Sequence, residues 1–317
     1  MKTTFVTVLK FLIGWPLAIL AIYYIYTIIA PNAGEILPRL LTIHISFLLL
    51  GMICFVIFYT LRGYVWHEIL HYYSYNFPFR ETLFLWEFSE LKRYIPGNIW
   101  SFLGRSVLFR QRGVTKQHLA TSFVVEAQLL VLSAMILSIL AVPYALSLYH
   151  IPDRLLVDVA VILAVIFFCL FFAGNTYILS LSDAKIVRLL RKVLPPFSPG
   201  KNLRLLTIDL VALLFYGMGN FLVISSLFAL PSGLFLVFSG YFVLALLIGY
   251  LSIIAPTGLG VREGVVILLL KNFTQTSFAG FLALFSRIIL IVSEVIFLSF
   301  AYMIHKRKFF VKKDTAI

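Results

Sequence analysis

Charged residues are scarce in this 317-residue chain, in which Asp, Glu, Lys and Arg together make up 12%. Soluble globular domains contain about 25% charged residues, so the composition excludes an ordinary soluble domain. Cysteine is scarcer still, since the chain has only Cys54 and Cys169, each inside an apolar run. This usage excludes a disulfide framework and a cysteine-based metal site.

Hydrophobic residues, by contrast, amount to 62% of the chain, and the mean hydropathy is +1.02. Several apolar runs exceed the roughly 20 residues that a helix needs to cross a bilayer. The sequence therefore predicts an all-α, polytopic integral membrane bundle that forms a single transmembrane domain over 1–317. No cleavage-site pattern follows the first run, so we expect it to be retained. The seven predicted spans are 5–29, 40–61, 119–148, 155–181, 205–230, 233–254 and 277–304.

Lys and Arg are distributed unevenly between the connecting segments. The strongly basic segments are 62–118, 182–204 and the tail after 305. The segments with a single Lys or Arg are 30–39, 149–154 and 271–276. Basic residues gather on the cytoplasmic side, so we expect a cell inner membrane protein with both termini in the cytoplasm. We attribute most of the net charge of +13 to this bias and expect it to attract anionic lipid headgroups, with no nucleic acid partner.

Two apolar stretches are interrupted by proline, glycine and charge. The first break contains Pro96 and Gly97, and the second contains the backbone-shaping residues Pro256, Gly258, Gly260 and Gly264. Proline removes a backbone N–H group and glycine loosens the helix. Backbone freed in this way persists at membrane depth only where protein buries it or where it lines a wet cavity. A pair of broken segments in the two halves of a chain is typical of a transporter site.

The predicted orientation constrains these breaks. Segment 82–110 lies within a region that starts and ends in the cytoplasm, so we expect a re-entrant hairpin from that side. Segment 233–270 should enter from outside, turn near the second break, and return as a short helix over 261–270. The sequence leaves open a full crossing by 233–254. Together the two segments predict an inverted arrangement that meets near the midplane.

Both breaks also carry a family resemblance. The relevant runs are Arg93-Tyr-Ile-Pro-Gly-Asn-Ile-Trp100, Gly104-Arg105, Arg112-Gly113-Val114, Glu126, and Ala255-Pro-Thr-Gly-Leu-Gly-Val-Arg-Glu-Gly264. In order and spacing they resemble the lysylphosphatidylglycerol synthase transmembrane-region family of flippase-like proteins. The chain departs from the family pattern at Thr257, where glycine is common, and at Ala127, where arginine is common. The resemblance implies the lipid-translocating part without the soluble aminoacyl-transferase domain.

Charged residues inside the predicted membrane segments are the candidate site. A charge at the bilayer centre costs at least about 2.5–3.5 kcal/mol, so such residues face a cavity or a partner. We expect the arginines to hold a lipid phosphate, and the glutamates to hold the arginines or exchange protons. The structural alternative is a set of ion pairs that only hold the bundle together, and we favour it for Asp209. The candidate headgroup-binding residues are Arg262, Glu263, Arg287, Arg105, Glu126 and Glu294.

One further motif, His67-Glu68-Ile69-Leu70-His71, matches the zincin pattern H-E-x-x-H. On a helix both histidines would share a face and could bind zinc, with Glu90 or Glu126 as a third ligand. The pattern is short, and the aromatic residues around it are typical of an interfacial amphipathic helix. We favour the interfacial helix, and therefore expect no metal at His67 and His71.

Together these features predict a protein, not an enzyme and without a cofactor, that moves an amphiphilic lipid or a lipid-linked carrier between leaflets. Its expected partners are membrane lipids that carry a phosphate. One alternative is a non-transporting partner of a membrane glycosyltransferase, which would be active only in complex. Two others are a lipid-modifying transferase using Glu126 or Glu263, and an intramembrane zinc protease using His67, Glu68 and His71. Product formation from lipid alone would support the transferase. Zinc found by metal analysis of the purified protein would support the protease.

Overall fold

The computed structural model describes residues 29–94, 99–149, 199–252, 258–271 and 273–314, together with Tyr23, Tyr26 and Thr27. Throughout these residues the regular structure is helical, with no strand, which confirms the predicted all-α class. The predicted span 155–181 and nearly all of 5–29 lie outside the described residues. The elements are η1 (Ala30–Asn32), α2 (Ala33–Leu41), α3 (Ile45–Tyr72), α4 (Phe79–Glu90), η2 (Leu91–Tyr94), α5 (Trp100–Arg110), α6 (Lys116–Tyr149), α9 (Pro199–Ser225), η3 (Ser232–Leu234), α10 (Phe235–Leu251), α11 (Val261–Leu270) and α12 (Thr276–Asp314).

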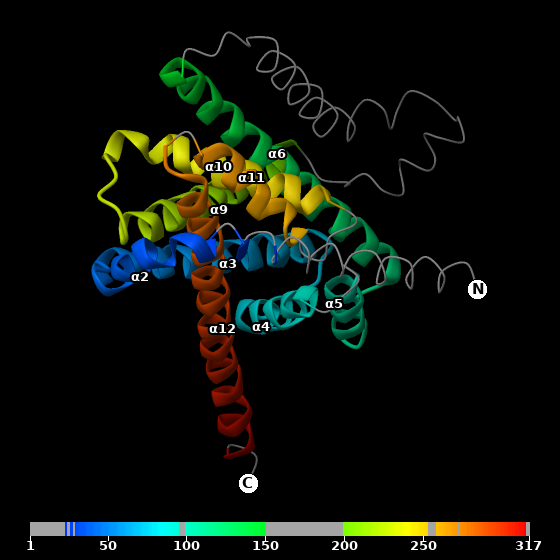
Figure 1. The fold of residues 1–317 in the computed structure, drawn as a ribbon. Helices are drawn as coiled ribbons and strands as arrows, with labels where there is room; N and C mark the ends of the chain where they lie inside the picture. The colour runs from blue at the N-terminus through cyan, green and yellow to red at the C-terminus, as the bar shows by residue number, and fades with distance from the viewer. Residues whose placement is uncertain are drawn as a thin grey trace, which may run out of the picture.

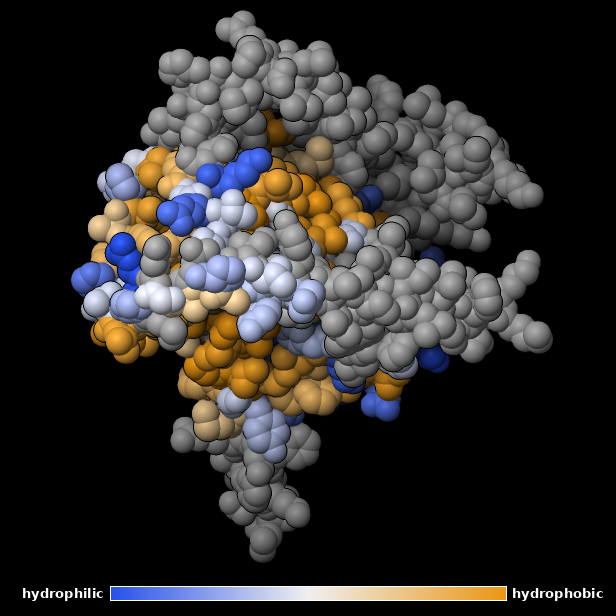
Figure 2. Space-filling view, viewed as in Figure 1, coloured by the Kyte–Doolittle hydropathy of each residue, from blue (hydrophilic) through white to orange (hydrophobic). Residues whose placement is uncertain are grey.

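Five of the described helical stretches are long and apolar enough to cross a membrane. They are Ile45–Tyr72, Lys116–Ile139, Gly200–Ser225, Ser232–Leu251 and Thr276–His305. Their outward faces are apolar, as on α12, where Ile288, Val292 and Val295 are exposed. Figure 2 shows apolar side chains over much of the described surface on the face in view. This surface is suited to contact with lipid and not with water.

Helix α3 is longer than the sequence predicts. The predicted span ended at residue 61 because Arg62 follows, but the helix continues without a break to Tyr72. Arg62 is buried inside it and forms an ion pair with Asp209 on α9. A partner 147 positions away therefore makes a mid-helix arginine tolerable. The stretch around His67 is accordingly the end of α3, and the predicted span boundary at residue 61 is wrong.

Helices α3 and α9 form the central pair of the fold. They approach closely at glycines, because a Cβ atom on Gly51 would lie 3.0 Å from the Gly219 carbonyl oxygen. Next to this crossing the rings of Phe58 and Tyr216 pack with their centroids 5.2 Å apart. Small residues at the crossing and aromatic residues beside it bring the two backbones together and fill the space around them.

Two helical hairpins lie on opposite sides of this central pair: α4–α5 beside α3, and α10–α11 beside α9 (Figure 1). The remaining long helices pair reciprocally with these hairpins, since α6 packs on α10 and α12 packs on α4. Each half of the described chain thus contains a long helix, a broken hairpin and a second long helix. The reciprocal packing fits the inverted arrangement that the two breaks predict.

Each hairpin is closed at its base by side-chain contacts. In the first, Phe77 packs on Phe109 with ring centroids 6.0 Å apart, and Arg112 pairs with Glu81. In the second, Phe273, which follows α11, packs on Phe238 near the start of α10 with centroids 5.1 Å apart. In both hairpins the chain entering the first helix and the chain leaving the second therefore lie side by side. The described residues that flank the breaks, Tyr94 and Ile99 in the first hairpin and Ser252 and Gly258 in the second, lie at the hairpin tips.

Candidate functional site

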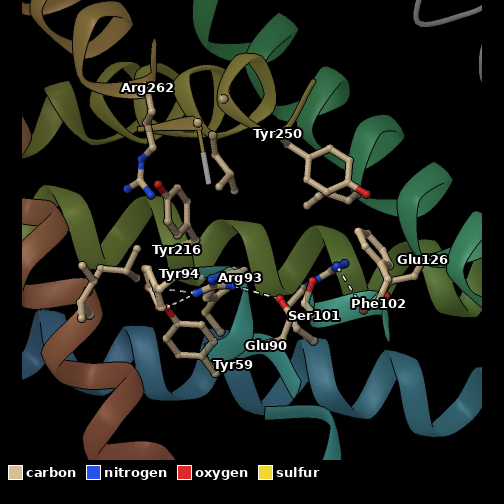
Figure 3. A pocket seen from close by; sticks show the side chains of 18 of the residues that line it. Tyr59, Glu90, Arg93, Tyr94, Ser101, Phe102, Glu126, Tyr216, Tyr250 and Arg262 are labelled. Atoms are coloured by element: carbon tan, nitrogen blue, oxygen red, sulfur yellow. Dashed lines mark hydrogen bonds and ion pairs between the residues drawn. The ribbon is translucent and has the colours of Figure 1, made fainter. Parts of the chain in front are cut away.

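A cavity of about 440 Å³ lies where the two hairpin tips meet (Figure 3). Tyr94 and Ile99 from the first tip line it, as do Ser252 and Gly258 from the second. Long helices complete the wall, with Tyr216 contributed by α9. The arginines that line the cavity are Arg62, Arg93, Arg105, Arg262 and Arg287. Such a concentration of cations in an apolar bundle marks the candidate site.

The glycines of the second break let its backbone turn against α10. Gly258 has a φ of +65°, and a Cβ atom there would lie 2.6 Å from the Gly249 backbone. Gly260 has a φ of +84°, and its N–H group donates to Glu263 Oε2 at 2.6 Å, which caps the start of α11. A Cβ atom on Gly264 would meet no atom within 4 Å. Pro96, Gly97 and Pro256 lie outside the described residues.

One end of the cavity is built around Arg105 and Glu126. Arg105 Nη1 donates to Glu126 Oε2 at 2.6 Å, and Trp86 Nε1 donates to the other carboxylate oxygen at 2.9 Å. Arg105 also pairs with Glu90, and its guanidinium lies 4.4 Å from the ring centroid of Trp66. With 1% of Arg105 exposed, this is a buried and fully bonded ion pair. Both carboxylates at this end of the cavity, Glu90 and Glu126, are therefore paired with Arg105.

A second cluster fixes Arg93 at the first hairpin tip. Arg93 Nη2 lies 2.6 Å from Glu294 Oε2 on α12, and Arg93 Nη1 lies 3.1 Å from Glu90 Oε2. The same Glu294 oxygen accepts hydrogen bonds from Tyr59 at 3.1 Å and from Tyr94 at 2.7 Å. Glu294 is completely buried. The tip of the first hairpin is thus bonded to the last long helix through one carboxylate.

The third cluster joins α11 to α12. Glu263 forms an ion pair with Arg287, and both side chains are buried. Glu263 does not pair with its neighbour Arg262, because consecutive side chains on a helix point about 100° apart. Arg262 points into the cavity toward Tyr216, with its guanidinium carbon 5.4 Å from the ring centroid (Figure 3).

Arg262 differs from the other arginines of the cavity. Arg62, Arg93, Arg105 and Arg287 each have a carboxylate partner. Arg262 has none among the described residues, and its Nη2 atom is buried without a hydrogen-bond partner. Its side chain is nevertheless largely enclosed, since only 8% of the residue is exposed. A buried guanidinium with an unused donor is costly unless an anion binds there.

A family model, described as the lysylphosphatidylglycerol synthase TM region, matches residues 8–297. The chain belongs to this family. The match covers both hairpins and every arginine of the cavity, and it confirms the resemblance inferred from the sequence. Together with the apolar helices, membership shows a multi-pass membrane protein. No curated protein matches the chain.

In this family member, all six predicted site residues lie at or beside the cavity. Arg105, Glu126, Arg262 and Arg287 line it. Glu263 and Glu294 stand behind and bind Arg287 and Arg93. Three further charged residues that line the cavity were not predicted to bind the headgroup: Arg62, Arg93 and Glu90. For Arg93 a signal was present, since it immediately precedes the Tyr-Ile-Pro-Gly run of the first break.

The H-E-x-x-H residues lie away from this cavity, on the last turns of α3. His67 Nδ1 contacts Thr82 Oγ1 at 3.3 Å, and Glu68 Oε1 lies 3.4 Å from Arg204 Nη2. Within the described segments, no group of three or more His, Cys, Asp and Glu residues is placed to hold a metal ion. These side chains therefore have packing and ion-pair contacts of their own.

Proposed function

We propose that this protein moves a phosphate-bearing lipid between the leaflets of the cell inner membrane. The headgroup would enter the cavity between the hairpin tips while the acyl or prenyl chains stay in the bilayer. The observation that carries the proposal is Arg262, a buried arginine that faces the cavity without a carboxylate partner among the described residues. The family description, which names a phosphatidylglycerol-related membrane region, supports a lipid-related role.

Arginine is suited to this task because its planar guanidinium binds two phosphate oxygens at once. Nη2 of Arg262 has an unused donor, and Arg287 lines the same cavity from α12. A phosphate bound between them would satisfy the donor of Arg262. Charge-assisted hydrogen bonds in a low-dielectric site would offset the free-energy cost of removing that phosphate from water.

The pairing of the carboxylates favours an anionic headgroup over a cationic one. Glu90 and Glu126 are the carboxylates that line the cavity among the described residues, and arginines bind both. An ammonium group in the cavity would have to displace Arg105 from one of them. The headgroup that fits best therefore carries a phosphate and does not depend on an amine for binding.

The apolar part of the lipid needs a route out of the cavity to the bilayer. Ile99, just before α5, and Phe102, within α5, both line the cavity. Each of the two residues is also 37% exposed. Tyr250, near the end of α10, lines it and is 41% exposed. The cavity thus reaches the molecular surface beside apolar and aromatic side chains. Lipid chains could follow this surface while the headgroup stays among the arginines.

The experiment is lipid transfer by purified protein in vesicles of phosphatidylcholine that contain a trace of fluorescent phosphatidylglycerol. A membrane-impermeant reductant destroys the outer-leaflet label, so further loss of fluorescence reports transfer. We expect loss in protein-containing vesicles and little in protein-free ones. Equal, slow loss in both would contradict the proposal. Glycosyltransferase activity that appears only when this protein is present, without lipid transfer, would favour the partner function instead. Mass spectrometry of co-purified lipid identifies the natural ligand.

A further inference from the structure

Glu87 is a buried carboxyl group that the cavity arginines do not neutralise. It lies on α4 and is completely buried, and neither of its carboxylate oxygens has a hydrogen-bond partner in the described part of the chain. The Oε1 atom of the buried Glu294 lacks a partner in the same way. Helices α4 and α12 pack on each other. Their carboxylates, Glu87 and Glu294, together have three buried oxygen atoms that accept no hydrogen bond from a described residue.

An ionised carboxylate in this position would be expensive. Taking a charge out of water without a hydrogen bond or an ion pair strongly disfavours the charged form. A carboxyl group avoids this cost by keeping its proton. Burial, followed by the negative charge of Glu294, holds the pKa of Glu87 well above its ordinary value.

The groups around Glu87 come from every element that packs on α4. Helix α12 contributes Glu294, α3 contributes Tyr59, η2 contributes Arg93 and α5 contributes Arg105. Glu90 follows on α4 itself. Of the cations, Arg93 is bonded to Glu294 and Glu90, and Arg105 is bonded to Glu90 and Glu126. Both cations are therefore engaged with other carboxylates.

We propose that Glu87 and Glu294 form a proton-binding site beside the cavity. In this proposal Glu87 carries the proton, while Glu294 is held by its ion pair with Arg93. Arg93 also lines the cavity. When an anionic headgroup attracts Arg93, Glu294 loses its cation and binds a proton from water as a neutral carboxylic acid. This second step rests on the proposed lipid function, whereas the protonation of Glu87 does not.

A proton fits this site better than a metal ion. Calcium and similar hard cations take six to eight oxygen ligands, and magnesium takes about six. The pair offers three unpartnered carboxylate oxygens from two residues. Binding a proton also has an electrostatic advantage, since the membrane potential acts on every net charge that moves across the bilayer. A proton bound together with one phosphate charge makes the cargo neutral.

Infrared spectroscopy of the purified protein tests the protonation of Glu87 directly. A protonated carboxylic acid shows a C=O stretching band that an ionised carboxylate lacks, and this band shifts to lower frequency in D2O. We expect the band at neutral pH in the wild-type protein and its loss in Glu87→Gln, which closely resembles a protonated glutamate and should fold. Glu81→Gln on the same helix, whose wild-type carboxylate pairs with Arg112, is the matched control and should keep the band. An unchanged band in Glu87→Gln would overturn the proposal.

Proton uptake on ligand binding tests the second step. Short-chain phosphatidylglycerol is added to detergent-solubilised protein in weak buffer with a pH indicator, and binding is measured in parallel. We expect uptake of about one proton per bound lipid in the wild type and none in Glu294→Gln. Binding without uptake in the wild type would overturn the coupling. Absence of both lipid binding and transfer, with the Glu87 band intact, would count against the lipid function and leave the protonated carboxyl in place.

Discussion

Glu263 on α11 forms its ion pair with Arg287 on α12, 24 positions further along the chain. This contact joins the short returning helix of the second hairpin to the helix that follows it. It also leaves the neighbouring Arg262 without a carboxylate among the described residues. Two adjacent charged residues thus have separate roles: one holds the hairpin in place and the other faces the cavity.

Arg287→Ala should destabilise the protein. It leaves Glu263 buried without its cation, and breaking a buried pair in this way costs about 3–5 kcal/mol. Thermal unfolding in detergent measures the loss. The double variant Arg287→Gln with Glu263→Gln should recover part of the stability, because both charges are then absent. Equal stability of Arg287→Ala and the wild type would contradict the structural role of this pair.

Arg262→Ala should reduce lipid transfer while protein abundance and thermal stability stay near normal. Hydrogen bonds to a charged group contribute about 1.5–3 kcal/mol, which corresponds to about 10–100-fold in rate. Arg262→Lys should also be impaired, because lysine keeps the charge but cannot bind two oxygens with a planar fork. The vesicle transfer assay measures both variants. Lys271→Ala, at the exposed end of α11, is the control. Full transfer by Arg262→Ala would remove this residue from the site.

Gly258→Ala should disturb the second hairpin, and Gly264→Ala should not. Alanine at the positive φ of Gly258 costs about 1–2 kcal/mol, and its Cβ atom would also collide with the Gly249 backbone. At Gly264 there is open space within a helix, so alanine should be neutral or stabilise by about 0.5–1 kcal/mol. Thermal unfolding of the two variants provides the comparison. The reverse order of stability would contradict the positive φ of Gly258.

Cysteine labelling tests the proposed orientation. In a background with Cys54 and Cys169 replaced by serine, cysteines at Ile151 and Phe273 should react with an impermeant thiol reagent in whole cells. A cysteine at Ser198 should react only after the membrane is opened. Protection at position 273 would argue for a full crossing instead of a hairpin that returns outside. Labelling of position 198 from outside would invert the orientation.

Replacing His67 and His71 together by glutamine should leave lipid transfer close to the wild-type level. The change removes the contact between His67 and Thr82, for which we expect a stability loss of about 1 kcal/mol. Elemental analysis of the purified wild-type protein should find no stoichiometric zinc. One zinc ion per chain, lost in the double variant, would support the protease hypothesis.

The sequence predicted the helical class and the places where two apolar stretches break because these signals are local. Proline and glycine interrupt a helix through their own backbones, as Gly258 and Gly260 do by taking a positive φ. The predicted end of α3 failed for the opposite reason. The charge of Arg62 suggested a boundary, but its partner Asp209 lies on another helix, and no local pattern records that contact.

The candidate site was predicted in part for the same reason. Buried charges in apolar runs are rare enough to be found by inspection, so Arg105, Arg262 and Arg287 were identified. Their pairing was not predictable, because it depends on which helices lie side by side. Glu87 was missed because a glutamate in the charged stretch before a break suggests a solvated residue, whereas the packing of α12 on α4 buries it.

The lengths of the hairpins bear on the energy barrier of the transfer. With ten residues, α11, the shorter of the two helices in the second hairpin, rises about 15 Å, roughly half of the 30 Å hydrocarbon thickness of a bilayer. In the proposed arrangement, a hairpin of this depth brings its polar tip to the middle of the low-dielectric layer. A charged headgroup would then face two thin insulating layers in succession and never the whole membrane at once. The broken helices would thus divide one high barrier into two lower ones.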